Sequence, residues 1–179
     1  VVLNLVLRAS PLRLTGVLVS AAPTGTDALG VTQAAVDLSG KGLALNLGSS
    51  VAQTLANEPG MAMRYNGPMA NVPVIRGLTG DRILVLQDGE RTGDLSSASA
   101  DHALSIDPFS ADRIEVIRGP ASLLYGNNAL GGVVNVISND IPTDVPTRPT
   151  FFLGGQGESV TPGGVIGGGG TIPLGSKVA

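Results

Sequence analysis

The chain has 179 residues, of which 42% are hydrophobic and 14% are charged, and its formal net charge is −3. A chain of this size buries one ordinary hydrophobic core, with room for a short appendage. An acidic balance with only 3% aromatic residues excludes a basic nucleic-acid-binding surface, and the lack of cysteine excludes disulfides, thiolate zinc sites and cysteine nucleophiles.

The N-terminal part of the sequence contains two β-prone stretches and a linker. Residues 1–8, VVLNLVLR, read as a strand that Pro11 ends, so we assign 1–13 to the end of an upstream β-domain or to an N-terminal extension. Residues 14–22, LTGVLVSAA, are a second such stretch, either a buried edge strand or an exposed extended segment. Gly, Thr, Asp and Ser dominate the residues that follow, up to 39, and predict an extended linker. No signal peptide is visible before Val1, so we expect a processed or truncated N-terminus.

A compact region begins near Gly40. Ser49 or Ser50 can cap a short helix that buries Val51 and Leu55, and Pro59-Gly60 ends it. Residues 72–77 and 82–90 are expected to form strands, the second of which ends in the tight-turn pair Asp88-Gly89.

The second half of this region holds a polar loop and two more strands. The loop contains the only histidine, His102, directly after Asp101, and Ser110 or Asp107 can start a helical turn after it. In the expected strand 113–117, alternation directs Ile114, Val116 and Arg118 to one face and Glu115 and Ile117 to the other. Residues 131–138 form a further strand. Short strands mixed with short helices predict a small α+β domain of about 100 residues.

The C-terminal residues change in character. After a Pro-punctuated connector, residues 151–170 begin with two phenylalanines side by side and continue with a high density of glycine. Glycine at this density does not by itself support a packed strand core. The segment is compatible with a soluble linker and with a pair of barrel strands.

Residues 40–142 resemble the plug domain of TonB-dependent outer-membrane receptors, with the marks in the family's order. These marks are Asn57-Glu58-Pro59-Gly60-Met61, Ile75-Arg76-Gly77, Asp88-Gly89, the run from Arg113 to Pro120, Leu124-Tyr125-Gly126 and Gly131 to Asn135. The resemblance implies a mixed β-sheet plug with short helices, normally enclosed in a 22-stranded β-barrel that is absent or only begun here. It divides the chain into an N-terminal extension (1–13), a TonB box with its linker (14–39), the plug (40–146) and the first barrel strand or strands (147–179).

The resemblance places a TonB box in the β-prone stretch near residue 15. Such a box is a short extended segment that TonB captures by adding it to a sheet edge through main-chain hydrogen bonds. It lacks the acidic first residue often seen in the family, and a buried strand is the alternative. The residues implied are Thr15, Gly16, Val17, Leu18, Val19 and Ser20.

Two arginines, Arg76 and Arg118, each stand directly before a glycine. The resemblance implies that these arginines pair with glutamates of the barrel wall. A guanidinium can bind a carboxylate bidentately, and such a pair holds the plug while a mechanical pull can still break it. The alternatives are ordinary surface ion pairs worth less than about 1 kcal/mol and an internal pair of Arg118 with Glu115.

The loop with Asp101 and His102 is similar to the corresponding loop of zinc-uptake receptors, in which an Asp-His pair supplies part of a metal site. The barrel would supply the missing ligands, because zinc sites need three or four. The competing interpretation is a solvated histidine hydrogen-bonded within its loop. Asp94 and Asp107 lie nearby, and we expect a turn former and a helix start rather than ligands.

These features predict a transport protein rather than an enzyme, because neither a catalytic triad nor a phosphate-binding glycine loop is recognisable. The expected function is gated, energy-coupled uptake of a metal ion, zinc above all, or of a metal chelate, and no cofactor is required. The expected partners are TonB with ExbB and ExbD, the receptor's own barrel and the outer membrane, and nucleic acid is not an expected partner. The expected location is the outer membrane, with the plug in the barrel lumen and the N-terminus in the periplasm. The alternatives are a siderophore or other organic-ligand receptor and a free-standing soluble periplasmic binding module. We expect the chain to be a fragment.

Overall fold

The computed structural model describes residues 34–67, 70–93, 95–99, 101–119, 125–138, 147–159 and 163–174. The expectations for the N-terminal extension, for the TonB box and for Asp94 lie outside these residues. None of the described helices is long and apolar enough to cross a membrane.

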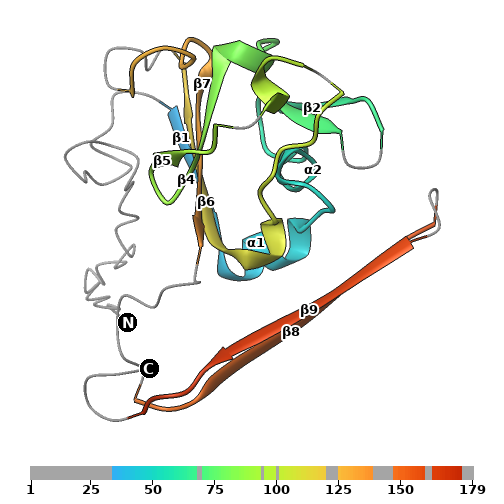
Figure 1. Cartoon of the computed structure of the whole chain (residues 1–179), viewed down its shortest axis with the longest axis vertical. Helices are drawn as coiled ribbons and strands as arrows, with labels where there is room; N and C mark the ends of the chain where they lie inside the picture. The colour runs from blue at the N-terminus through green and yellow to red at the C-terminus, as the bar shows by residue number, and fades with distance from the viewer. Residues whose placement is uncertain are drawn as a thin grey trace, which may run out of the picture.

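A five-stranded mixed sheet forms the centre of the molecule (Figure 1). The strand order is β1-β6-β7-β4-β5, in which β4 and β7 are parallel and all other neighbours are antiparallel. The strands are β1 (Ala34–Ser39), β4 (Ile83–Gln87), β5 (Glu90–Arg91), β6 (Ala111–Arg118) and β7 (Gly132–Ser138). The predicted mixed sheet with short helices is confirmed.

Short helices and a separate hairpin cover one face of this sheet. They are α1 (Gly40–Asn46), α2 (Val51–Leu55), the antiparallel pair β2 (Met61–Tyr65) and β3 (Asn71–Ile75), and the 3-10 turns η1 (Gly80–Arg82), η2 (Leu95–Ser97) and η3 (Pro108–Ser110). A second hairpin, β8 (Thr150–Glu158) and β9 (Gly163–Thr171), extends beside this body as a long ribbon (Figure 1).

Local sequence accounts for the helix and the turn that were expected. Ser50 caps α2, since its Oγ accepts a hydrogen bond from the backbone N–H of Gln53 at 3.1 Å. Asp88 and Gly89 both have positive φ, 51° and 83°, as a tight two-residue hairpin turn requires. The Asp88 carboxylate also accepts a hydrogen bond from the backbone N–H of Ser138 at 2.8 Å, which joins the turn to β7.

The core has two parts, one on each face of the sheet. Ile114 and Val116 of β6 pack with α1 and α2, whereas Ile117 packs on the opposite face with Val133 of β7 and Leu84 of β4. The alternation expected along β6 is therefore confirmed. Each fully buried aliphatic side chain of this kind stabilises the fold by about 1.5–3 kcal/mol relative to exposure.

The sheet begins earlier in the chain than the expected boundary at residue 40. Residues 34–39, assigned to the linker on composition, form β1, which pairs along its whole length with β6. The pattern AAVDLS carries little strand preference of its own, so the pairing with β6 decides its conformation.

Candidate functional site

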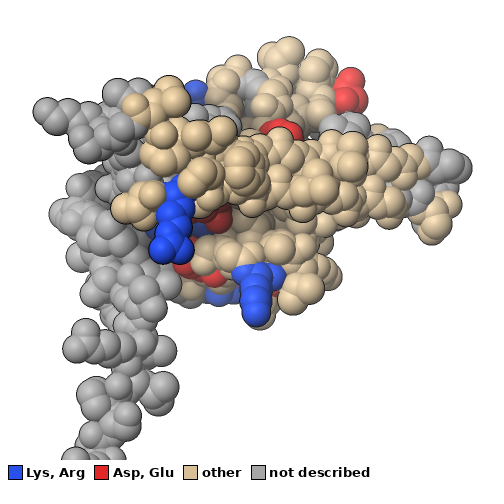
Figure 2. Space-filling model, turned by 90° about the horizontal axis from the view of Figure 1, so that it is seen from below, with Lys and Arg blue, Asp and Glu red and all other residues tan. Residues whose placement is uncertain are grey.

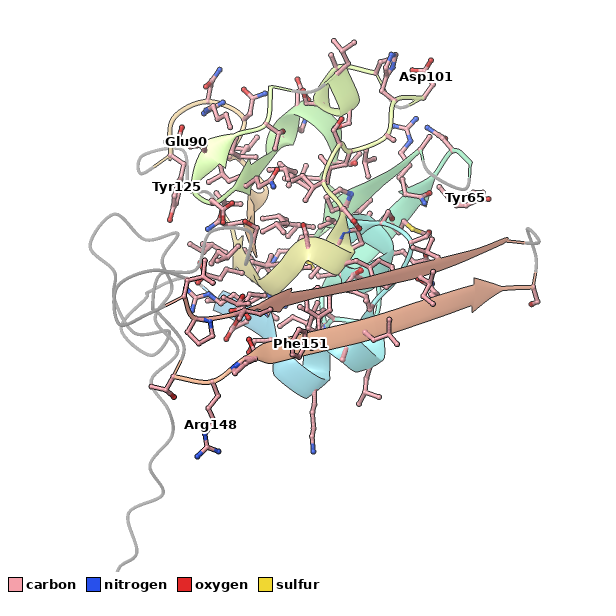
Figure 3. All side chains as sticks on the ribbon, turned by 60° about the horizontal axis from the view of Figure 1, so that its bottom comes forward. Tyr65, Glu90, Asp101, Tyr125, Arg148 and Phe151 are labelled. Carbon is pink, nitrogen blue, oxygen red and sulfur yellow. The ribbon has the colours of Figure 1, made fainter. Side chains whose placement is uncertain are left out.

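Asp101 and His102 contact each other on an exposed loop. The Nδ1 atom of His102 lies 3.1 Å from Oδ1 of Asp101, and the two side chains are 48% and 78% exposed, respectively. The Ser99 hydroxyl donates a hydrogen bond to the same carboxylate oxygen. Hydrogen bonds from Ser99 and then from His102 hold the pKa of Asp101 below its usual range. Figure 3 shows Asp101 at the end of the molecule away from Phe151 and the β8–β9 hairpin.

This geometry gives the two residues different chemical roles. With Nδ1 of His102 directed to a carboxylate, Nε2 is the nitrogen left for a metal ion, and Asp101 fixes the ring orientation. Within the described residues, no group of three or more His, Cys, Asp or Glu side chains is arranged to hold a metal. The loop therefore presents one imidazole with its orienting carboxylate.

Asp107, the other described acid of this region, starts a helical turn as expected. Its Oδ1 atom accepts a hydrogen bond from the backbone N–H of Phe109 at 2.9 Å and caps η3.

Arg76 and Arg118 meet at the Pro59-Gly60 turn that follows α2. The Arg118 guanidinium donates a hydrogen bond to the carbonyl of Pro59, and the backbone N–H of Arg76 donates to the carbonyl of Gly60 at 3.3 Å. Arg76 has a φ of 49°, a left-handed conformation uncommon outside glycine. The Nε atom of Arg118 is buried and has no hydrogen-bond partner among the described residues. The structure thus brings the backbone of Arg76, directly after β3, and the guanidinium of Arg118, at the end of β6, to the same turn.

A row of polar side chains crosses the second face of the sheet. Asp37 of β1 lies opposite Glu115 of β6, and Glu115 lies opposite Asn135 of β7. Glu115 is 1% exposed, and its Oε1 atom lies 3.2 Å from Nε of Arg113. Strand alternation separates Glu115 from Arg118 and gives it Arg113 instead, two residues away on the same face. Neither Arg113 nor Asp37 is among the site residues expected from the sequence, although strand alternation places Arg113 on the face of Glu115.

Burial perturbs the ionisable groups around this row. Burial raises the pKa of Asp37, an effect that the nearby Arg113 charge partly offsets and the Glu115 charge reinforces. Burial, together with the charge of Glu115, raises the pKa of Tyr125 to about 12. The Tyr125 hydroxyl and Oδ1 of Asp37 are buried without hydrogen-bond partners in the described part of the chain.

A small cavity of about 120 Å³ lies beside the loop of Asp101, between β4 and η2. Its lining includes Ile83, Arg91, Ser96 and Leu104. Pockets that enclose an organic ligand usually measure about 300–1,000 Å³, so this cavity does not enclose one by itself.

The β8–β9 hairpin has one fully exposed face and one that is partly covered. Phe151, Leu153 and Ile166 share the exposed face and are 73%, 81% and 79% exposed. Thr150, Gln156 and Thr171 share the other face with Phe152 and Val165, and the two faces alternate along each strand. Figure 2, seen from below, shows this hairpin as an uncharged band across the molecule.

The family profile described as TonB-dependent Receptor Plug Domain matches residues 27–133, more than half of the chain. This chain belongs to that family. The match includes β1 and begins before the boundary expected at residue 40. It covers Arg76, Asp101, His102 and Arg118, and it assigns the chain to receptors rather than to enzymes.

Individual relatives agree with this assignment. The plug is 35% identical over 120 residues to the vitamin B12 transporter BtuB of Photobacterium profundum, a match that covers 66% of this chain and 20% of the transporter. The ferric enterobactin receptor PfeA of Pseudomonas aeruginosa, solved with enterobactin, is 26% identical with a TM-score of 0.53 over 66% of this chain and 19% of the receptor. The siderophore receptor PirA of Acinetobacter baumannii shares the fold, with a TM-score of 0.57 at 22% identity over 80% of this chain and 22% of the receptor. The chain thus spans about a fifth of the length of these relatives.

Proposed function

We propose that this chain is the plug and first wall hairpin of an outer-membrane active transporter. The two-faced β8–β9 hairpin carries the proposal. Its exposed face holds Phe151, Leu153 and Ile166, and its partly covered face holds Thr150, Gln156 and Thr171 together with Phe152 and Val165. Membrane barrel strands place an apolar face toward lipid and a more polar face toward the lumen, and the more polar face here is the one turned to the plug. A free-standing soluble module would expose the apolar face to water.

In this proposal the plug lies in the barrel lumen with its N-terminus in the periplasm. TonB, driven by ExbB and ExbD, captures residues 15–20 and pulls on the chain just before β1. Since β1 is an edge strand that pairs only with β6 in the described sheet, a pull from its N-terminal side acts directly on the sheet's edge.

Arg76 and Arg118 then hold the plug against glutamates of the barrel wall. Their position supports this, because the Arg118 guanidinium and the backbone of Arg76 meet at one turn. A wall carboxylate would bind each guanidinium through N–H donors other than the covered Nε of Arg118.

The proposed cargo is a metal ion, with zinc favoured, or a metal chelate. His102 is oriented by Asp101 and exposed to the outside of the plug, so Nε2 can complete a site whose other ligands come from the barrel. The alternative cargo is a siderophore or another organic ligand, which the named cargo of the enterobactin receptor favours. The small cavity beside the loop does not enclose such a ligand by itself, so at this loop the ligand would bind against the outside of the plug.

The zinc assignment predicts that His102→Ala lowers uptake of radioactive zinc by about tenfold or more in cells expressing the receptor that contains this plug. The control is Leu95→Ala, because Leu95 is 62% exposed on the same loop and has no ligating group. Both variants should reach the outer membrane in equal amounts. Equal zinc uptake by the two variants would reject zinc as the cargo and leave the organic-ligand receptor.

The coupling assignment predicts that a peptide of residues 12–24 binds the C-terminal domain of TonB in solution, as measured by calorimetry. Val17→Pro should weaken binding by about tenfold, because the proline removes a main-chain donor worth about 1 kcal/mol and disturbs the added strand. Val17→Thr keeps a β-branched side chain and should bind normally. An absence of binding by the unaltered peptide would show that residues 15–20 are not the TonB box.

A further inference from the structure

All three phenylalanines of the chain lie against glycines of the β8–β9 hairpin. Two of them belong to the hairpin itself, where Phe151 covers its cross-strand partner Gly170 and Phe152 covers Gly169. The third, Phe109, comes from η3 in the plug. Its ring lies over Gly154 and Gly167, which face each other across the two strands.

The contact of Phe109 with this glycine pair is close. A Cβ atom built on either Gly154 or Gly167 would lie 3.6 Å from a carbon of the Phe109 ring, which is van der Waals contact. An alanine would therefore fit at either position, whereas a larger side chain would displace the ring. Both glycines lie on the partly covered face of the hairpin.

The ring is held firmly on the plug side. The backbone N–H of Phe109 donates to Oδ1 of Asp107 at 2.9 Å, and Ala111, two residues later, begins β6. Because β6 is paired with both β1 and β7, the position of the ring follows the position of the central sheet. Phe109 therefore links the sheet of the plug to the hairpin through a short, capped turn.

Beside this contact the hairpin stands away from the plug. A groove of about 900 Å³ runs between α1 and the strands and is lined by Leu43, Leu47, Phe152 and Gly168 among others. Phe109 and Gly167 also line this groove, so their contact lies at its wall.

We propose that the pair Gly154 and Gly167 is a seat for the Phe109 ring and that this seat sets the register of the plug against its wall. Glycines in a strand leave the backbone uncovered, and an aromatic ring placed over them restores packing. The hairpin itself supplies such rings at Gly170 and Gly169, through Phe151 and Phe152. At the pair Gly154 and Gly167 the ring comes from the plug. The proposal rests on the proposed function in one respect, that the hairpin is part of the barrel wall.

A disulfide test uses the full 179-residue chain in detergent micelles. A Cβ atom on Gly167 would lie 3.9 Å from Cβ of Phe109, which matches disulfide geometry, and the natural chain has no cysteine to interfere. Phe109→Cys with Gly167→Cys should close an intramolecular disulfide under mild oxidation. It should do so at least about tenfold faster than Phe109→Cys with Gly168→Cys, because Gly168 lies on the opposite face of the hairpin.

Mass spectrometry of the linked peptides and non-reducing electrophoresis measure the two rates. Equal rates, or no intramolecular disulfide in either variant, would overturn the proposal. Should the cysteine variants fail to fold, nuclear Overhauser effects between the Phe109 ring and the α protons of Gly154 and Gly167 test the contact in the unaltered chain. Their absence, with both segments assigned, would overturn it as well. Neither readout depends on uptake or on TonB, so failure of the seat and failure of the transport proposal are distinguishable.

Discussion

Gly132→Ala is expected to lower the free energy of unfolding of the plug by at least about 3 kcal/mol. Gly132 begins β7 with a φ of 150°, a conformation that L side chains rarely adopt. A Cβ atom there would lie less than 3.0 Å from the carbonyl oxygen of Ile117 on β6. That oxygen belongs to the backbone of the neighbouring strand, so β6 and β7 would have to separate to admit the methyl group.

The matched control is Gly77→Ala, at a glycine with a φ of 82° and no atom within 4 Å of an added Cβ. Gly77→Ala should therefore lose only the free energy needed to hold an L residue in a left-handed backbone conformation, about 1–2 kcal/mol. Denaturant unfolding of the two variants, followed by circular dichroism, compares their midpoints with that of the unaltered chain. Equal midpoints for the two variants would show that β6 and β7 do not approach each other as closely at Gly132 as the structure indicates.

Features set by local chemistry were predictable from the sequence. The Ser50 cap, the Asp88-Gly89 turn and the helical start at Asp107 each depend on a side chain and its immediate neighbours. The two faces of β6 follow from strict strand alternation. The family resemblance added the arrangement of these elements and was confirmed by the family match.

Features set by distant contacts were not predictable in the same way. Strand β1 has a weak strand pattern and owes its conformation to pairing with β6, which lies about 75 residues later in the chain. Helix α1 begins at Gly40 without a side-chain cap and is held through the burial of Leu43. The ion pair of Arg113 with Glu115 was within reach of strand alternation, but its burial depends on how both neighbouring strands pack.

In the candidate metal loop, too, local sequence indicated one feature and the three-dimensional arrangement determined another. Its composition identified Asp101 and His102 as a pair, and the adjacency of the two residues suggested two direct ligands. The contact between Nδ1 of His102 and Oδ1 of Asp101 instead suits one ligand and one orienting group. Such a contact depends on backbone and rotamer geometry, and neither can be read from a dipeptide.

Glu115→Ala is expected to destabilise the plug by about 3–5 kcal/mol, because it leaves Arg113, on a largely buried face, without the carboxylate that lies 3.2 Å away and with only the Asp37 charge nearby. Arg113 is 28% exposed and can reach water only in part. Glu115→Gln keeps the volume and a hydrogen-bonding oxygen and should cost less. The double variant Glu115→Ala with Arg113→Ala should be more stable than the sum of the single changes indicates, because neither member of the ion pair is left without the other.

The titration of Tyr125 distinguishes loss of the Glu115 charge from loss of the packing that the Glu115 side chain provides. The charge of Glu115 contributes, after burial, to the pKa of about 12 at Tyr125, so Glu115→Gln should lower that pKa toward 10 without reaching it. Phenolate absorbance against pH measures the shift in the folded chain. An unchanged titration, together with a small loss of stability in Glu115→Ala, would mean that Glu115 does not act as a buried charge. A lowered pKa with a large loss of stability would establish that a buried ion pair on β6 stabilises the plug. Opening the sheet between β1 and β6 would then require that ion pair to be hydrated.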